Sequence, residues 1–283
     1  MIFRRHPRPA HPLGHFYSPI VDTDEASKQA ARIWPESPQV LGIDFNDDSH
    51  RRILTEVFPR FIGDYDYPDE LPRRAPRIAY YNLNSQFGWL DARALFVLLR
   101  EWRPRRVIEV GSGYSSLLIN DVNARFFGGA CEVTCIEPYP REFLQAQPGL
   151  TVVEAKVQEA PLELFATLDA GDVLFIDSSH VAKTGSDVNW LYFEVLPRLK
   201  PGVRIHVHDI FLPHDYPQDW VIKENRSWNE QYVLQALLMH SNAFRVLFGS
   251  TYAFWKYPEL VRDALALADG RAFGGCSIWF EKR

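Results

Sequence analysis

Apolar positions divide the chain into an irregular N-terminal part and a regular remainder. A strong helical stripe first occurs at Leu90, Ala94, Leu95, Leu98 and Trp102, and the helix ends before Pro104. Beyond it, short apolar runs alternate with longer helical patterns. This alternation is typical of a parallel sheet with helices on both faces, because strands that are buried on both faces are apolar throughout.

The regular part is predicted to contain seven strands with helices between them. The predicted strands cover residues 107–110, 131–136, 151–155, 172–176, 203–207, 244–248 and 277–281. The predicted helices after the first cover residues 115–127, 141–146, 162–168, 188–195, 229–240 and 258–268.

Residues 1–77 differ from the rest, since they hold ten of the 20 prolines and the acidic stretch 63–70. Two short helices are expected there, at residues 24–33 and 47–61. We interpret residues 1–77 as an N-terminal extension and residues 78–283 as the main domain. The extension is either a decoration packed on that domain or a lid or cap over a substrate, and the sequence leaves both interpretations open.

Composition narrows the classes of partner. The net charge of −5 lacks the basic footprint that nucleic acids require. No stretch has the roughly 20 apolar residues needed to span a membrane, and no secretory signal follows Met1, so we expect a cytoplasmic protein. Cys131 and Cys135 are too far apart in one strand for a disulfide, and reduced thiols are expected. The oligomeric state stays open, a homo-oligomer included.

The candidate chemistry lies directly after the predicted strands. In open α/β sheets, ligands bind at the carboxyl ends of the strands, near the point where the strand order reverses. Polar and acidic residues are concentrated there, at residues 109–113, 137–138, 157–158, 177–180 and 208–209.

The first of these segments is a glycine turn, Glu109-Val-Gly-Ser-Gly-Tyr-Ser-Ser116. Glycines between a strand and a helix let the backbone approach a ligand closely. The full dinucleotide motif is absent, because position 116 is Ser. Glu109 would repel a pyrophosphate and attract a sulfonium or an ammonium group. Glu137 follows the next strand, where an acidic residue accepts hydrogen bonds from ribose hydroxyls.

Together these segments resemble the class I S-adenosylmethionine-dependent methyltransferases, over residues 84–283. The resemblance implies an αβα sandwich with a mostly parallel seven-stranded sheet and an antiparallel final strand. It also implies that the glycine turn surrounds the methionine portion of S-adenosylmethionine, that Glu137 binds ribose, that residues 157–158 contact adenine and that Asp177 faces the methyl group. The predicted cofactor-binding residues are Glu109, Gly111, Ser112, Gly113, Ser115, Ser116, Glu137, Pro138, Val157, Gln158, Asp177 and Ser178.

Two further segments, Phe175–His180 and Val207–Asp209, resemble the small-molecule O-methyltransferases of natural-product pathways. Some of those enzymes bind a divalent metal through one Asp after the fourth strand and an Asp pair after the fifth. Here Asp177 occupies the first place, and His208-Asp209 replaces the pair. The resemblance thus implies Mg²⁺ or Mn²⁺ held by Asp177 and Asp209, although a His ligand suits Mn²⁺, Zn²⁺ or Fe²⁺ better than Mg²⁺.

The expected reaction is methyl transfer from S-adenosylmethionine to an oxygen or nitrogen of a small-molecule acceptor. The predicted catalytic residues are His180 as the first candidate base, His208 as the second, and Asp177 beside the methyl group. We expect His206 to be structural and to lie on the opposite side of its strand from His208.

Two alternatives remain. His180, His208 and Asp209 could form the two-His-one-carboxylate set of a non-haem metal enzyme, which iron content would reveal. The chain could also be a non-catalytic S-adenosylmethionine-binding module, which would bind the cofactor without turnover.

Overall fold

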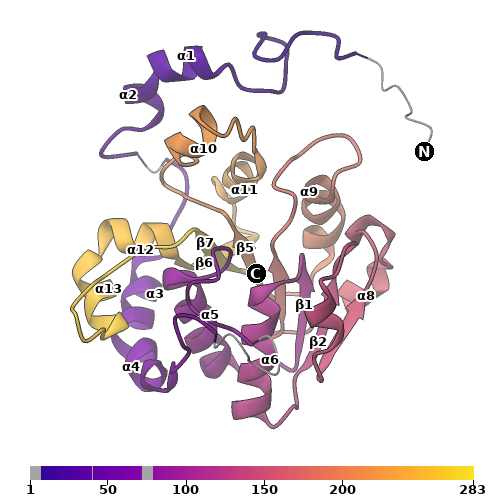
Figure 1. Cartoon of the computed structure of the whole chain (residues 1–283), viewed down its shortest axis with the longest axis vertical. Coiled ribbons are helices and arrows are strands. Elements are labelled where there is room, and N and C mark those ends of the chain that lie inside the picture. Colours follow the sequence, from indigo (N-terminus) through magenta and orange to yellow (C-terminus); the bar gives the residue numbers. More distant parts are fainter. Residues whose placement is uncertain (1–7, 40, 72–78) are drawn as a thin grey trace.

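The computed structural model of the protein describes residues 8–39, 41–71 and 79–283. Its centre is one seven-stranded sheet with the order β3-β2-β1-β4-β5-β7-β6 (Figure 1). The strands are β1 (Arg106–Val110), β2 (Glu132–Ile136), β3 (Leu150–Val153), β4 (Val173–Ile176), β5 (Arg204–His208), β6 (Phe244–Gly249) and β7 (Ser277–Lys282). The pairings among β1 to β5 are parallel, and β7 is antiparallel to both β5 and β6. The predicted fold class is confirmed.

The strand order reverses beside β1. The chain first moves from β1 outward to β2 and β3, then returns to place β4 on the other side of β1. The carboxyl ends of β1, β2 and β4 therefore meet at one edge of the sheet, and the helices that follow β1 and β4 diverge there. In this fold class such a divergence opens a crevice for a ligand.

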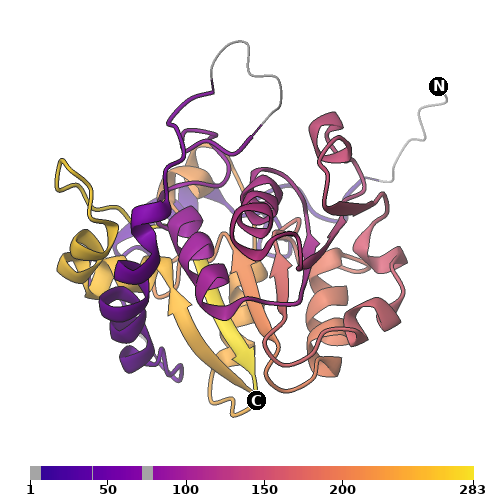
Figure 2. The ribbon, with the colours of Figure 1, turned by 90° about the horizontal axis from the view of Figure 1, so that it is seen from below.

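Helices cover both faces of the sheet (Figures 1 and 2). Alternation along β1 shows the two layers, because Val107 belongs to one core and Ile108 to the other. The first core includes the π-helical segment Ile53–Val57 that follows α3 (Asp47–Arg52), and the helices α4 (Phe58–Phe61), α5 (Trp89–Trp102), α6 (Tyr114–Phe127) and α13 (Pro258–Leu265). The second includes α8 (Leu162–Ala166), α9 (Asp187–Trp190) and α11 (Glu230–Leu238). The remaining α-helices are α1 (Thr23–Lys28), α2 (Ala30–Ile33), α7 (Glu142–Gln145), α10 (Gln218–Ile222) and α12 (Ser250–Lys256).

The N-terminal residues divide into two parts. Helices α1 and α2 lie beside α10, at the top of Figure 1, where Trp34 Nε1 donates to the carbonyl of Tyr216 at 2.7 Å. The residues from α3 to α4 instead pack into the first core, with Ile53, Leu54 and Phe58 fully buried. Both predicted helical regions are present. The predicted boundary at residues 77 and 78 lies outside the described residues, and the lid stays a prediction.

No helix in the described ranges is both long enough and apolar enough to cross a membrane.

Candidate functional site

Two cavities lie at the carboxyl edge of the sheet. The first has a volume of about 390 Å³ and is lined by the residues that end β1, β2 and β4, among them Gly111 and Glu137. The second has a volume of about 670 Å³ and is lined by Trp89, Asp209 and Trp228, among others. Among the described residues, Asp177 is the one that lines both cavities. A ligand in the first cavity can therefore face the second across this carboxylate.

Gly111 brings the ends of β1 and β4 into close contact. Its φ is +79°, and a Cβ atom at this position would lie 1.8 Å from the carbonyl oxygen of Asp177. The amide of Gly111 donates to the carbonyl of Ile136 at 3.0 Å, and the amide of Asp177 donates to that of Val110 at 2.8 Å. Only glycine fits here, because any side chain would separate the two strand ends.

Glu137 is fixed by backbone amides at the wall of the first cavity. Its Oε2 accepts from the amide of Ser112 at 3.2 Å, and its Oε1 accepts from the amide of Tyr139 at 2.8 Å. Each carboxylate oxygen has about two acceptor positions, so both can still accept a hydrogen bond from a ligand hydroxyl. The carboxylate is therefore already positioned before a ligand binds.

Glu109 lies beneath the glycine turn and does not line the first cavity. Its side chain is fully buried, and it accepts from Ser115 Oγ at 2.6 Å and from Cys135 Sγ at 3.3 Å. Burial raises the pKa of Glu109 to about 7. Ser116 Oγ accepts from the amide of Gly113 at 3.0 Å. These residues support the turn from within, and the predicted contacts of Glu109, Ser115 and Ser116 with the cofactor stay predictions.

His180 lies among three carboxylates. Its Nε2 is 3.4 Å from Asp177 Oδ1 and 3.4 Å from Asp209 Oδ2, and its Nδ1 is 2.9 Å from Glu230 Oε2. Burial opposes the charged imidazole, but the hydrogen bonds with Asp177 and Glu230 outweigh burial and raise the pKa of His180 to about 10. Without a metal ion, the imidazole is therefore protonated at neutral pH.

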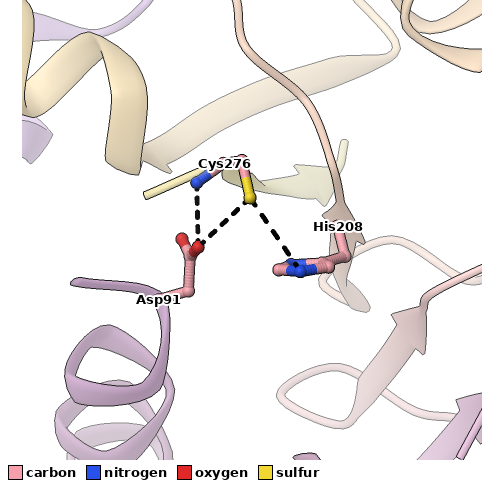
Figure 3. Close-up of side chains that lie close together, drawn as sticks. All are labelled: Asp91, His208 and Cys276. Carbon is pink, nitrogen blue, oxygen red and sulfur yellow. Dashed lines mark hydrogen bonds between the residues drawn. The ribbon is translucent and has the colours of Figure 1, made fainter. Parts of the chain in front are cut away.

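A second cluster joins side chains from three elements, which Figure 3 shows together, and all three residues line the second cavity. Asp91 comes from α5, His208 ends β5 and Cys276 directly precedes β7. The sulfur of Cys276 lies 3.6 Å from Asp91 Oδ2 and 3.9 Å from His208 Nε2.

The wall of the second cavity is aromatic. The guanidinium of Arg226 lies 4.1 Å from the ring centre of Trp220 and 4.8 Å from that of Trp228, and it forms an ion pair with Glu224 at 2.7 Å. Trp228 also packs against the ring of His180, with 4.4 Å between ring centres. Such a wall suits stacking against a flat group of a ligand.

Comparison with known proteins agrees with this architecture. A family model described as a methyltransferase domain matches residues 108–210, from β1 to just past β5. The chain belongs to the class I S-adenosylmethionine-dependent methyltransferases. An uncharacterized protein of Archaeoglobus fulgidus is 36% identical to this methyltransferase over 164 residues, which are 56% of this chain and 73% of that protein.

Two solved structures are similar in fold at low sequence identity. One is the SAH-bound methyltransferase of Podospora anserina, with 14% identity, a TM-score of 0.43, and coverage of 98% of this chain and 100% of the other. The other is the O-methyltransferase from Bacillus cereus in complex with SAH, with 13% identity, a TM-score of 0.41, and coverage of 81% and 90%. Both similarities are too low to transfer an acceptor to this methyltransferase.

The structure brings most of the predicted site residues together. The first cavity is lined by Gly111, Glu137, Pro138, Val157, Gln158, Asp177 and Ser178. Ser112 and Gly113 belong to the turn but do not line this cavity, and the buried hydroxyl of Ser112 has no hydrogen-bond partner. Of the predicted metal ligands, Asp177 and Asp209 lie together, with His180 as a third potential ligand.

The histidines of β5 correct one expectation. Residues two apart in a strand share a face, so His206 lies on the same side as His208, with stacked rings whose centres are 6.0 Å apart. The prediction that His206 faces the opposite side is wrong. The non-haem alternative is also weakened, because His180 and His208 belong to different clusters.

Several site residues were not predicted. They are Asp91, Cys276, Trp89, Trp220 and Arg226, which line the second cavity. The sequence did hold one indication of this cluster. Asp91 is a carboxylate within the apolar stripe of α5, and a buried carboxylate requires a polar partner.

Proposed function

We propose that this methyltransferase transfers a methyl group from S-adenosylmethionine in the first cavity to an oxygen or nitrogen of a small molecule in the second. The position of Asp177 in the walls of both cavities carries this proposal. The sulfonium makes the methyl group electrophilic, so the main task of the protein is to hold donor and acceptor in line. Two adjoining cavities at one sheet edge suit that task.

The second cavity favours a small acceptor. Its volume of about 670 Å³ lies within the roughly 300–1,000 Å³ of small-molecule sites. The tryptophans offer stacking surfaces, and the carboxylates on the floor favour hydroxyl or amine donors over anions.

The three-residue set of Asp177, His180 and Asp209 fits a divalent metal ion. The separations of 3.4 Å match neighbouring ligands around an ion with bonds of about 2.0–2.2 Å. Glu230 behind Nδ1 fixes the ring with Nε2 toward the carboxylates, as partners of metal-ligating histidines do. A bound ion would lower the pKa of an acceptor hydroxyl and orient it.

His180 suits a ligand better than a base. Glu230 holds Nε2 of the ring toward the carboxylates of Asp177 and Asp209, and an ion bound there would displace the Nε2 proton to solvent. We therefore assign His180 to ion binding with Asp177 and Asp209, and Asp177 also to aligning the acceptor at the junction of the two cavities.

Turnover with a panel of small hydroxyl and amine acceptors, followed as formation of S-adenosylhomocysteine, tests the proposal. Asp177→Asn should lose at least about 100-fold in turnover, the scale of a lost positioning group, yet still bind S-adenosylmethionine. Asp169→Asn is the control, because Asp169 pairs with Lys200 and Arg105 near the opposite edge of the sheet. Full turnover in Asp177→Asn would contradict the proposal, and cofactor binding without turnover on any acceptor would favour the non-catalytic module.

The metal is tested by exhaustive chelation. Activity should fall and return with Mn²⁺ or Mg²⁺. Full activity in protein shown by elemental analysis to be metal-free would remove the ion from the proposal and leave the three residues as polar positioning groups.

A further inference from the structure

The cluster of Asp91, His208 and Cys276 lines the acceptor cavity but has no assigned step in the reaction proposed above. Three potential ligand atoms of different type, a carboxylate oxygen, an imidazole nitrogen and a sulfur, lie within 4.8 Å of one another. The residues come from α5, β5 and the segment before β7, so the tertiary fold assembles them (Figure 3).

His208 is buried without a satisfactory hydrogen bond. Its side chain is 5% exposed, and Nδ1 has no partner. Its Nε2 has only distant polar neighbours, Asp209 Oδ1 at 3.8 Å and Cys276 Sγ at 3.9 Å. Leaving a buried polar group unpaired is costly, so such groups in native proteins call for an explanation. A metal ion at Nε2 would replace these two distant contacts with a direct bond, and Nδ1 would still lack a partner.

The spacing agrees with that explanation. Around a tetrahedral zinc ion, with bonds of about 2.3 Å to sulfur and about 2.0 Å to nitrogen or oxygen, a sulfur lies about 3.5 Å from each neighbouring ligand. The sulfur of Cys276 is 3.6 Å from Asp91 Oδ2 and 3.9 Å from His208 Nε2. The ligand atoms of Asp91 and His208 lie within 4.8 Å of each other, so these side chains must move closer together to complete the set.

We propose that Asp91, His208 and Cys276 form a binding site for a thiophilic divalent ion such as Zn²⁺, separate from the set of Asp177, His180 and Asp209. Three protein ligands leave a fourth position, as in catalytic zinc sites. All three residues line the second cavity, which gives the ion a path of entry and faces the fourth position toward the acceptor.

Hydrogen bonds already hold the carboxylate of Asp91 in position. Asp91 Oδ2 accepts from the amide of Cys276 at 2.8 Å, and Asp91 Oδ1 accepts from Ser277 Oγ at 2.5 Å, so the carboxylate is fixed. Burial, with Asp91 and Asp209 nearby, holds the pKa of the Cys276 thiol well above its usual range, so the free protein carries the proton. On ion binding, the sulfur bonds to the ion as thiolate and its proton passes to solvent.

Asp209 links the two sets. Its Oδ1 is 3.3 Å from the sulfur of Cys276, and its Oδ2 is 3.4 Å from Nε2 of His180. The carboxylate can therefore stabilise ions on either side of it.

Cobalt titration of the chelated full-length protein tests the site, because Co²⁺ bound to a thiolate gives a sulfur-to-cobalt charge-transfer band in the near ultraviolet. The wild type should develop this band, and Cys276→Ser should lose it together with one equivalent of bound cobalt. Cys131→Ser is the matched control, since Cys131 is a buried thiol at the other end of the sheet and should leave the band intact. A wild type without the band, or a band retained in Cys276→Ser, would overturn the site.

Two further measurements keep the result independent of folding and of the proposed reaction. In the wild type, Zn²⁺ should protect Cys276 from alkylation, and unchanged alkylation would count against the site even if Cys276→Ser failed to fold. Asp177→Asn should keep the band while losing turnover. A band that disappeared in Asp177→Asn would show that the sulfur serves the other ion, and the separate site would be rejected.

Discussion

The fully buried carboxylate of Glu230 lies 2.9 Å from Nδ1 of His180. Ser178 Oγ donates to the same Glu230 oxygen at 2.7 Å. His180 itself has a positive φ of 61°, an uncommon conformation for a residue with a side chain. The loop after β4 thus holds one ring nitrogen on a buried acid, and the other nitrogen points to Asp177 and Asp209.

From this contact we predict the effect of Glu230→Gln. The variant keeps the size of the side chain but removes the charge that orients His180, so Mn²⁺ affinity should fall about 10–100-fold. Metal titration followed by calorimetry measures it. Glu194→Gln changes a partly exposed acid that pairs with Arg198 and should leave affinity unchanged. Equal affinities in all three proteins would show that Glu230 does not act on the ion.

Gly111→Ala should disrupt the cofactor turn. A methyl group there would lie 1.8 Å from the carbonyl oxygen of Asp177, so the ends of β1 and β4 must separate. Gly129→Ala is a matched control, because Gly129 has the same φ of +79° but open space around the added Cβ.

Both variants carry the conformational cost of a left-handed residue, roughly 1–2 kcal/mol. Only Gly111→Ala should also lose S-adenosylmethionine affinity, by tenfold or more. Thermal unfolding with calorimetric titration separates the two effects, and equal cofactor affinity in both variants would show that the contact is not needed for binding.

Glu137→Ala should weaken S-adenosylmethionine binding by about 1–3 kcal/mol, the range for hydrogen bonds to a charged group. Glu132→Ala is the control, because Glu132 is an exposed acid at the start of β2 that pairs with Arg106. This variant should bind S-adenosylmethionine normally. An unchanged dissociation constant in Glu137→Ala would exclude its ribose role.

We predict that the buried imidazole of His50 makes the stability of the protein depend on pH. This ring accepts from the amide of Gly249 at 2.8 Å, and burial lowers its pKa to about 4. Above its unfolded pKa of 6.5 the ring is neutral in both states, and between pH 6.5 and 4 protons bind mainly to the unfolded chain. Stability should therefore fall as the pH decreases, by about 2 kcal/mol between pH 7 and 5 from this group. Denaturant unfolding at several pH values measures this. The free energy of unfolding of His50→Gln should decrease less between pH 7 and 5 than that of the wild type, and an equal decrease would contradict this account.

The fold could be predicted because parallel strands buried on both faces are recognisable as apolar runs. All seven strands are present, although their ends shift by one or two residues. The helices α10 and α12 were not predicted. α10 is barely more than one turn, and the aromatic-rich sequence of α12 directly follows β6 and has no clear helical period.

The site was predicted only where it follows from strand ends. Asp177, Glu137 and Asp209 had to meet at one edge, because parallel strands place their carboxyl ends together. Asp91 and Cys276 are 185 residues apart, and nothing local in the sequence indicates that the start of α5 reaches β7. The burial of Glu109 was not predicted either. Its side chain lies on the same face of β1 as Val107, so it points into the layer of α5 and α6 rather than toward the cavity.

The most direct test of the central claim is a calorimetric titration of the purified protein with S-adenosylmethionine, with NAD as the comparison. Binding in the first cavity predicts a dissociation constant on the micromolar scale, about 8 kcal/mol of binding free energy, and no heat from NAD. The glycine turn, residues 109–116, contains no basic side chain that could pair with a pyrophosphate. The side chain that contacts the turn, Glu137, is acidic. Binding of NAD without binding of S-adenosylmethionine would contradict the account.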